Sequence, residues 1–317
     1  MAKQKKGLKT SSKSKKYLGI DRKRLLIGSV IVIVSILSMI ILAQKQQNKE
    51  IKTTENETLD FAALANEVIP QNGFETNAKW GCTGKKLVES GAINLEKFKL
   101  LYERGGRPLT ETQLSILTKC TDETLKIDNG NAHFMLNVLW ALGLSNKNAL
   151  LDKIAKEADF DIGNLASTGG WPLGNISGGE LWGKYEIIKL NAGQQKIVEK
   201  VALNTYRPCC NNPTAFPDCN HGAAALGLIE LMASQGATED DIFEALKIYN
   251  AYWFPQQYYE NAIYFKLAEG KEWKDVDPKV VLGFNYSSAS GWTQVSNYLR
   301  AQGIFKQVEG SGGQCGV

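Results

Sequence analysis

The chain has 317 residues, 43% of them hydrophobic, and a formal net charge of +4 at neutral pH. This charge is unevenly spread: residues 3–24 carry ten Lys or Arg and a single acidic residue, whereas the rest of the chain has 27 basic and 32 acidic residues. The basic character comes from one short terminal segment, so it gives no reason to expect a nucleic-acid partner, and we expect none.

The stretch LLIGSVIVIVSILSMIILA, residues 25–43, contains no charged residue. As a helix rising ~1.5 Å per residue it would be about 28 Å long, close to the ~30 Å hydrocarbon core of a bilayer. Residues 1–24 form a basic stub before it, so the positive-inside rule predicts a single-pass signal anchor in the cell membrane, with the N-terminus cytoplasmic and the rest extracytoplasmic. A cleaved signal peptide is the alternative, but its apolar region is usually only ~7–15 residues long.

The remaining chain divides by composition into three parts. Residues 44–58 are polar, with almost nothing apolar to bury, which predicts a tether between membrane and domain. Residues 59–305 have a globular composition and no Pro- or Ser-rich linker, so we expect one domain. Residues 306–317 are rich in glycine and predict a flexible tail that carries one cysteine.

Helical periodicity dominates the domain, and alternating strand patterns are hard to find. We therefore predict an all-α fold: a single N-terminal transmembrane helix followed by an extracytoplasmic α-helical bundle or short helical array. The helices are expected near residues 110–119, 132–144, 146–158, 192–205, 221–235, 238–250 and 252–268.

Local signals mark several helix ends. Thr110 lies three residues before Gln113, which is the spacing of a capping box, and Thr238 is expected to cap the helix that follows it. Gly143 is expected to end the apolar helix that begins near residue 132, and Gly236 is expected to follow the end of another.

A stretch rich in glycine and tryptophan interrupts the helical patterns. STGGWPLGNISGGELWGKYE, residues 167–186, has too many glycines for a long helix and predicts a structured loop. Trp171 and Trp182 either anchor this loop by packing, the commoner arrangement, or line an exposed groove that binds a cell-envelope polymer. The aromatic run at residues 249–265 could add to such a surface, but most of its side chains should be core, on a helix that Pro255 interrupts.

All six cysteines follow the predicted anchor, so we expect them outside the cytosol, where disulfides form. Cys82 and Cys120 are isolated in ordinary surroundings, and we expect a structural disulfide or plain buried thiols there. His133 is expected to be a core residue with its hydrogen bonds satisfied.

The densest group of reactive residues is RPCCNNPTAFPDCNHG, residues 207–222. Cys209, Cys210, Cys219 and His221 supply three sulfurs and one imidazole, a set suited to Zn²⁺, Cu(I) or another soft ion, in a loop stiffened by three prolines. Asp218 or Asn220 is expected to cap the next helix, leaving Cys219 near its positive end, where the thiolate is favoured. Cys315, on the Gly-rich tail, is a candidate fifth ligand or relay, or else the partner in a structural disulfide.

Three functions are compatible with these features. The first is metal binding by the cysteine cluster, in a membrane-anchored protein. The second is thiol–disulfide exchange with a thiol partner, in which Cys219 is the nucleophile, His221 stabilises its thiolate, and Cys209 or Cys210 resolves the mixed disulfide. The third is an envelope binding or scaffold module with structural disulfides. The sequence has no phosphate-binding glycine loop or other nucleotide-cofactor motif and no C-x-x-C pair.

Overall fold

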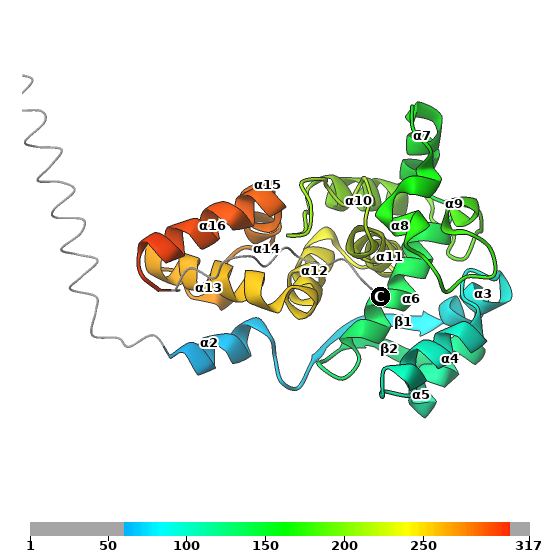
Figure 1. Ribbon diagram of the computed structural model, residues 1–317, viewed down its shortest axis with the longest axis horizontal. Coiled ribbons are helices and arrows are strands. Elements are labelled where there is room, and N and C mark those ends of the chain that lie inside the picture. The colour runs from blue at the N-terminus through cyan, green and yellow to red at the C-terminus, as the bar shows by residue number, and fades with distance from the viewer. Residues whose placement is uncertain (1–59, 305–317) are drawn as a thin grey trace, which may run out of the picture. The chain divides into compact units, whose positions relative to one another are not determined.

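The computed structural model describes residues 60–304, which are mostly helical (Figure 1). The N-terminal half contains α2 (Phe61–Val68), β1 (Phe74–Gly81), α3 (Thr83–Glu89), α4 (Leu95–Arg104), α5 (Glu111–Thr118), β2 (Thr121–Ile127), α6 (Ala132–Ser145), α7 (Ala149–Glu157), the 3₁₀ helix η1 (Ile162–Asn164), α8 (Ala166–Gly169) and α9 (Gly178–Leu181). The C-terminal half contains α10 (Ala192–Leu203), α11 (Asn220–Ser234), α12 (Glu239–Trp253), α13 (Pro255–Glu269), the 3₁₀ helix η2 (Trp273–Asp275), α14 (Pro278–Val281), α15 (Phe284–Ser287) and α16 (Ala289–Ala301).

The structure confirms the helical class and the approximate positions of the seven helices predicted between residues 110 and 268. Helix α5 begins with a capping box in which Thr110 and Gln113 bond each other's backbone N–H groups. Thr238 caps α12 in the same way, and Gly236 has a φ of +87° just beyond the end of α11. Polar side chains that satisfy the first N–H groups of a helix are therefore a reliable local signal here.

The centre of the domain is the packing of α6 against α11, both of which are buried almost all round. The prediction that Gly143 ends α6 is wrong, because the helix continues to Ser145. A Cβ at Gly143 would lie 1.9 Å from the backbone oxygen of Ala223, and a Cβ at Gly227 would lie 2.3 Å from that of Leu139. These two glycines let the helix backbones touch, so α11 packs against α6 without intervening side chains in its N-terminal half.

The sequence patterns missed a two-stranded antiparallel sheet formed by β1 and β2. In β1 the inward residues are Thr76, Ala78 and Trp80, and only the last is a large hydrophobic residue. The alternation of burial is regular, but the alternation of hydrophobicity is weak, which explains the omission.

The predicted break at Pro255 separates α12 from α13, with Pro255 as the first residue of α13. The aromatic run at residues 249–265 is largely core, as predicted: Tyr249 and Tyr258 are fully buried. Helix α13 packs against α2 and α16 (Figure 1).

Within residues 60–304, no helix combines the length and the hydropathy needed to cross a membrane. The predicted stub, anchor and tether, residues 1–58, and the predicted tail, residues 306–317, lie outside the described residues.

Candidate functional site

The loop between α10 and α11 wraps around the side chain of Arg207, which is only 1% exposed. Nη1 of Arg207 donates to the backbone oxygen of Asn212 at 3.0 Å, and Nη2 donates to that of Phe216 at 3.2 Å. Nη2 also forms an ion pair with Asp218. A guanidinium group carries five N–H donors in a fixed plane, so a single side chain holds three points of this irregular loop together.

Helix α11 leaves room for this guanidinium only because residue 222 is glycine. A Cβ at Gly222 would lie 2.5 Å from both Cζ and Nη2 of Arg207. The first turn of α11 and the buried cation are therefore packed face to face.

Cys219 caps α11, which corrects the prediction that Asp218 or Asn220 does so. Its Sγ accepts from the backbone N–H of Gly222 at 3.4 Å and from Nε of Arg207 at 3.2 Å. The side chain of Asn220 instead accepts from the N–H of His221. The sequence correctly placed Cys219 at the positive end of the helix, but the sulfur itself occupies the capping position.

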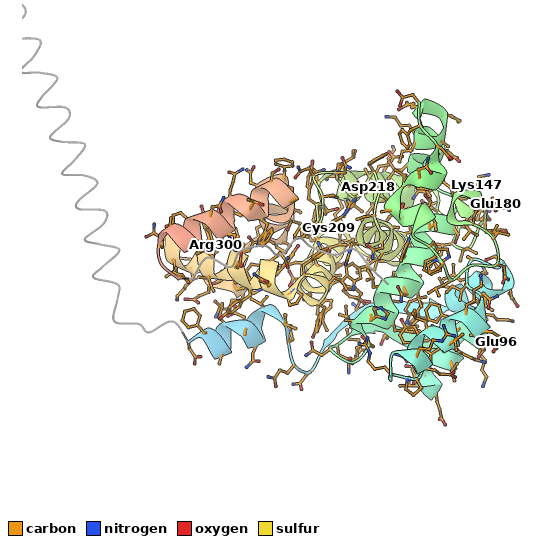
Figure 2. The ribbon with its side chains drawn as sticks, in the orientation of Figure 1. Glu96, Lys147, Glu180, Cys209, Asp218 and Arg300 are labelled. Carbon is orange, nitrogen blue, oxygen red and sulfur yellow. A yellow bond between two sulfur atoms is a disulfide. The ribbon has the colours of Figure 1, made fainter. Side chains whose placement is uncertain are left out.

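The other two thiols of the loop converge on Cys219. Sγ of Cys209 lies 3.4 Å from Sγ of Cys219. Sγ of Cys210 lies 3.6 Å from Oδ1 of Asp218, whose other oxygen accepts from Nδ2 of Asn212. Figure 2 shows Cys209 and Asp218 in the same region of the domain, beside α11.

The cluster contains two overlapping groups of atoms that could hold a metal ion. The first joins Cys209, Cys219 and His221, and the second joins Cys210, Asp218 and Cys219; within each group the ligand atoms lie within 4.8 Å of one another. All four cysteine and histidine ligands predicted for the described part of the chain are therefore brought together. The fifth, Cys315, lies outside the described residues.

The thiols differ in their tendency to ionise. Hydrogen bonds from Cys209 and Cys210, the charge of Arg207 and a hydrogen bond from His221 hold the pKa of Cys219 well below its usual value, although burial opposes this shift. For Cys210, the hydrogen bond with Cys209 favours ionisation, but the bond with Cys219 and burial outweigh it and raise the pKa to about 12. The arrangement therefore concentrates negative charge on the sulfur beside the guanidinium.

His221 is held against aromatic rings at the end of α12. Its ring centroid lies 4.3 Å from that of Phe254 and 6.2 Å from that of Trp253, and the side chain is 8% exposed. Packing against two rings in a buried position limits the orientations open to the imidazole.

The remaining sequence candidates lie elsewhere. Cys82 and Cys120 form a disulfide, which confirms the structural role preferred for them. His133 is only partly buried, and its Nδ1 has no hydrogen-bond partner among the described residues, so the prediction of a satisfied core histidine is wrong. Burial and the charge of Arg107 lower its pKa, and neither metal-binding group within residues 60–304 includes it.

The Gly/Trp-rich stretch contains two one-turn helices, α8 and α9; Trp171 is buried, and the partly buried Trp182 packs against the core. The indole N–H of Trp171 donates to the backbone oxygen of Ala92, and that of Trp182 donates to Leu151. These bonds tie the loop to distant segments, as the packing interpretation of the sequence predicted.

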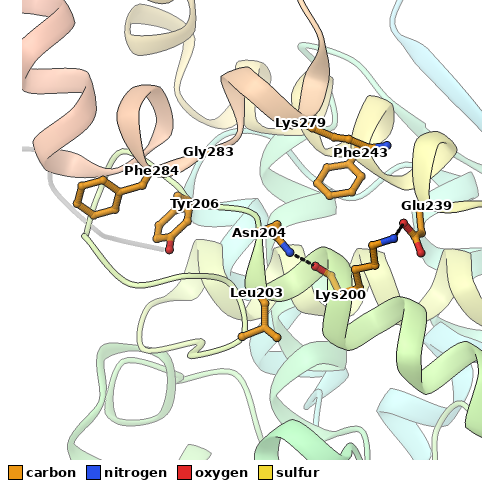
Figure 3. Close-up of a pocket in the computed structure, with 9 residues that line it drawn as sticks. All are labelled: Lys200, Leu203, Asn204, Tyr206, Glu239, Phe243, Lys279, Gly283 and Phe284. Carbon is orange, nitrogen blue, oxygen red and sulfur yellow. Dashed lines mark hydrogen bonds and ion pairs between the residues drawn. The ribbon is translucent and has the colours of Figure 1, made fainter.

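A cavity of about 390 Å³ lies between α10, α12 and the α14–α15 segment (Figure 3). Lys200 and Lys279 stand at its rim, but each is paired with an acidic residue, Glu239 and Asp240 respectively. Phe243, Phe284 and Tyr206 add aromatic surface. None of its described lining residues is a cysteine or histidine.

Sequence reasoning missed Arg207 and the ion pair that Asp218 makes with it. A single basic residue beside a cysteine pair is a weak signal, because most arginines are exposed. Comparison with protein-family models, curated proteins and solved structures finds no match to this chain. The cluster itself offers three sulfurs, an imidazole and a carboxylate beside one buried cation.

Proposed function

We propose that this domain binds a soft or borderline metal ion, Zn²⁺ or Cu(I), through Cys209, Cys219 and His221, with Cys210 beside them. The observation that carries the proposal is the convergence of two sulfurs and an imidazole nitrogen within 4.8 Å of one another at the start of α11. Thiolate and imidazole ligands are those that Zn²⁺ and Cu(I) prefer.

The spacing suits a metal ion. Zn–S bonds of ~2.3 Å and Zn–N bonds of ~2.0 Å place neighbouring tetrahedral ligands about 3.5–3.8 Å apart. The sulfurs of Cys209 and Cys219 are 3.4 Å apart, so they need to move by only a few tenths of an ångström.

The surroundings support the same conclusion. Ligating groups are commonly oriented by hydrogen bonds from residues behind them, and Arg207 and the Gly222 N–H both donate to Cys219. Arg207 also offsets the negative charge of a thiolate, while Asp218 balances Arg207. Removal of the cluster from water is therefore accompanied by charge compensation.

We also propose that the protein is a single-pass membrane protein whose domain lies outside the cytoplasm. The disulfide between Cys82 and Cys120 supports an oxidising compartment. Thiols 3.4 Å apart are exposed to oxidation in such a compartment, and a bound metal ion would protect them. Protease protection in intact cells tests the topology, because a domain on the cytoplasmic side would resist external protease.

The direct test is metal content. The full chain, solubilised in detergent and purified under reducing conditions, should contain close to one equivalent of Zn or Cu, measured by mass spectrometry of the elements. Cys219→Ser should lose the ion, whereas the double variant Cys82→Ser/Cys120→Ser is the matched control and should keep it. A wild-type chain that arrives without metal and takes up neither Zn²⁺ nor Cu(I) would refute the proposal.

A second candidate, thiol–disulfide exchange, is favoured by one specific observation: Cys209 and Cys219 are close enough to form a disulfide with a small movement. Cys219, the nucleophile expected from the sequence, is only 5% exposed, so we propose the reverse assignment: the partly exposed Cys209 forms the mixed disulfide with a partner, and Cys219 resolves that disulfide. Titration against a glutathione redox buffer, with mass spectrometry of the peptides, would reveal a reversible Cys209–Cys219 disulfide. A chain that keeps full metal content through the same titration favours the first candidate.

A further inference from the structure

The four side chains of the cluster differ in exposure. Cys219 and His221 are 5% and 8% exposed and lie at the start of α11, which the close contact with α6 holds in place. Cys209 and Cys210 are partly exposed and belong to the irregular loop before that helix. The site therefore has a buried rigid side and an accessible side.

On the accessible side, Cys210 is set apart from the ligand group that contains the histidine. That group consists of Cys209, Cys219 and His221, whereas Cys210 groups with Asp218 and Cys219. An ion held by the first group has three protein ligands. Closed structural zinc sites use four, and sites with three protein ligands leave one position for an external ligand.

The backbone of Cys210 is nevertheless fixed. Its carbonyl oxygen accepts from the N–H of Ala289 at 2.9 Å, and the neighbouring Asn211 side chain accepts from Ser290, both at the start of α16. Cys210 is thus a partly exposed sulfur held in a defined place next to the ligand group. A tethered ligand of this kind has an effective concentration on the order of millimolar or more at the site.

We propose that the cluster is a metal-exchange site. In this site Cys210 passes the ion from the ligand group of Cys209, Cys219 and His221 to a thiolate of a partner protein. This inference rests on the proposed metal binding. The buried pair retains the ion while its bond to Cys209 is replaced by a bond to Cys210, and the partner's thiolate then attaches from the accessible side.

Each step is a substitution of ligands without electron transfer. One metal–sulfur bond forms as the thiol of Cys210 loses its proton to solvent, and the bond to Cys209 breaks as that sulfur takes up a proton. Transfer is completed when the bonds to Cys219 and His221 are replaced by ligands of the partner. The metal keeps its oxidation state throughout.

The experiment measures the rate of Zn²⁺ transfer separately from the affinity for Zn²⁺. The full chain in detergent is loaded with one equivalent of Zn²⁺, and transfer to the chromogenic chelator 4-(2-pyridylazo)resorcinol is followed with and without glutathione as the thiol probe. Affinity is measured independently by equilibrium competition. The variants are Cys210→Ser and its neighbour Cys209→Ser, a matched pair in the same loop.

Cys210→Ser should slow transfer roughly tenfold at submillimolar glutathione, with a smaller loss of affinity, because the tethered sulfur is missing. Cys209→Ser should instead weaken affinity by about 10- to 100-fold and speed release, as expected for loss of a ligand. Equal transfer rates in wild type and Cys210→Ser overturn the inference, as does a loss of rate matched by an equal loss of affinity. Absence of any bound metal in the wild type would refute the proposed function itself.

Discussion

Gly222 lies so close to Arg207 that a Cβ at this position would sit 2.5 Å from the centre of the guanidinium group. Gly222, on the first turn of α11, thus sets the space available to the side chain of Arg207. Within the described loop, Arg207 is the only side chain that bonds all four of Asn212, Phe216, Asp218 and Cys219. This contact places Arg207 against Cys219 in the candidate metal cluster, although neither Gly222 nor Arg207 is one of the proposed ligands.

The first prediction follows from this contact. Gly222→Ala should destabilise the domain by about 1–3 kcal/mol, because a methyl group in a well-packed interior displaces its neighbours. It should also lower metal affinity, since Arg207 must move away from Cys219. Gly105→Ala is the control: its Cβ would meet Leu101 at an ordinary 3.4 Å, so the thermal midpoint should barely change. Equal midpoints for the two variants would contradict the packing described.

A second prediction concerns the buried charge. Arg207→Met keeps much of the side-chain volume but removes the cation that pairs with Asp218 and the donors to the backbone oxygens of Asn212 and Phe216. Breaking a buried ion pair costs about 3–5 kcal/mol, which denaturant unfolding would measure. Because Arg207 favours the ionised sulfur, the pKa of Cys219 should rise, so that its thiolate absorbance appears at higher pH in the metal-free variant. Arg104→Met, at an exposed position, should change neither property.

The limits of sequence reasoning are clear in this loop. The cysteines and His221 could be predicted as one cluster because they lie within thirteen positions, and helix signals on both sides fixed where α10 and α11 lie. Arg207 could not be assigned, because burial of a guanidinium depends on carbonyl oxygens whose directions are set only by the folded loop. For a similar reason Gly143 was misread: its role is the approach of α11, a helix about eighty residues away in the sequence.

A third prediction concerns the disulfide between Cys82 and Cys120, which are separated by 38 residues in the sequence. Replacing both with serine should cost about 2–4 kcal/mol, because the unfolded chain is no longer restricted by the cross-link. The thermal midpoint should fall and should no longer respond to a reductant. Metal content should be unaffected, since the cluster contains neither residue. A midpoint of the variant equal to that of the oxidised wild type would show that the cross-link adds no stability.

The last prediction is a pH dependence that originates away from the cluster, at Glu230 on α11. This carboxyl is fully buried; Asn148 donates to it at 2.6 Å, and Oε2 has no hydrogen-bond partner among the described residues. Burial raises its pKa to about 8, although the side-chain amides of Asn148 and Asn146 oppose the shift. The group is therefore largely protonated in the folded protein at neutral pH but ionised in the unfolded chain.

Linkage between protonation and folding determines whether stability rises or falls with pH. A raised pKa in the folded state contributes stability below the unfolded pKa near 4.5, and this stability is lost as pH rises toward 8. Glu230→Gln cannot ionise, and its amide oxygen can still accept from Asn148. Relative to wild type, the variant should thus gain stability between pH 5 and pH 8, on the order of 3–5 kcal/mol in total. Denaturant unfolding of both proteins at several pH values measures this difference, with Glu244→Gln on exposed surface as the control. Parallel stability curves for wild type and Glu230→Gln would show that this carboxyl does not titrate in that range.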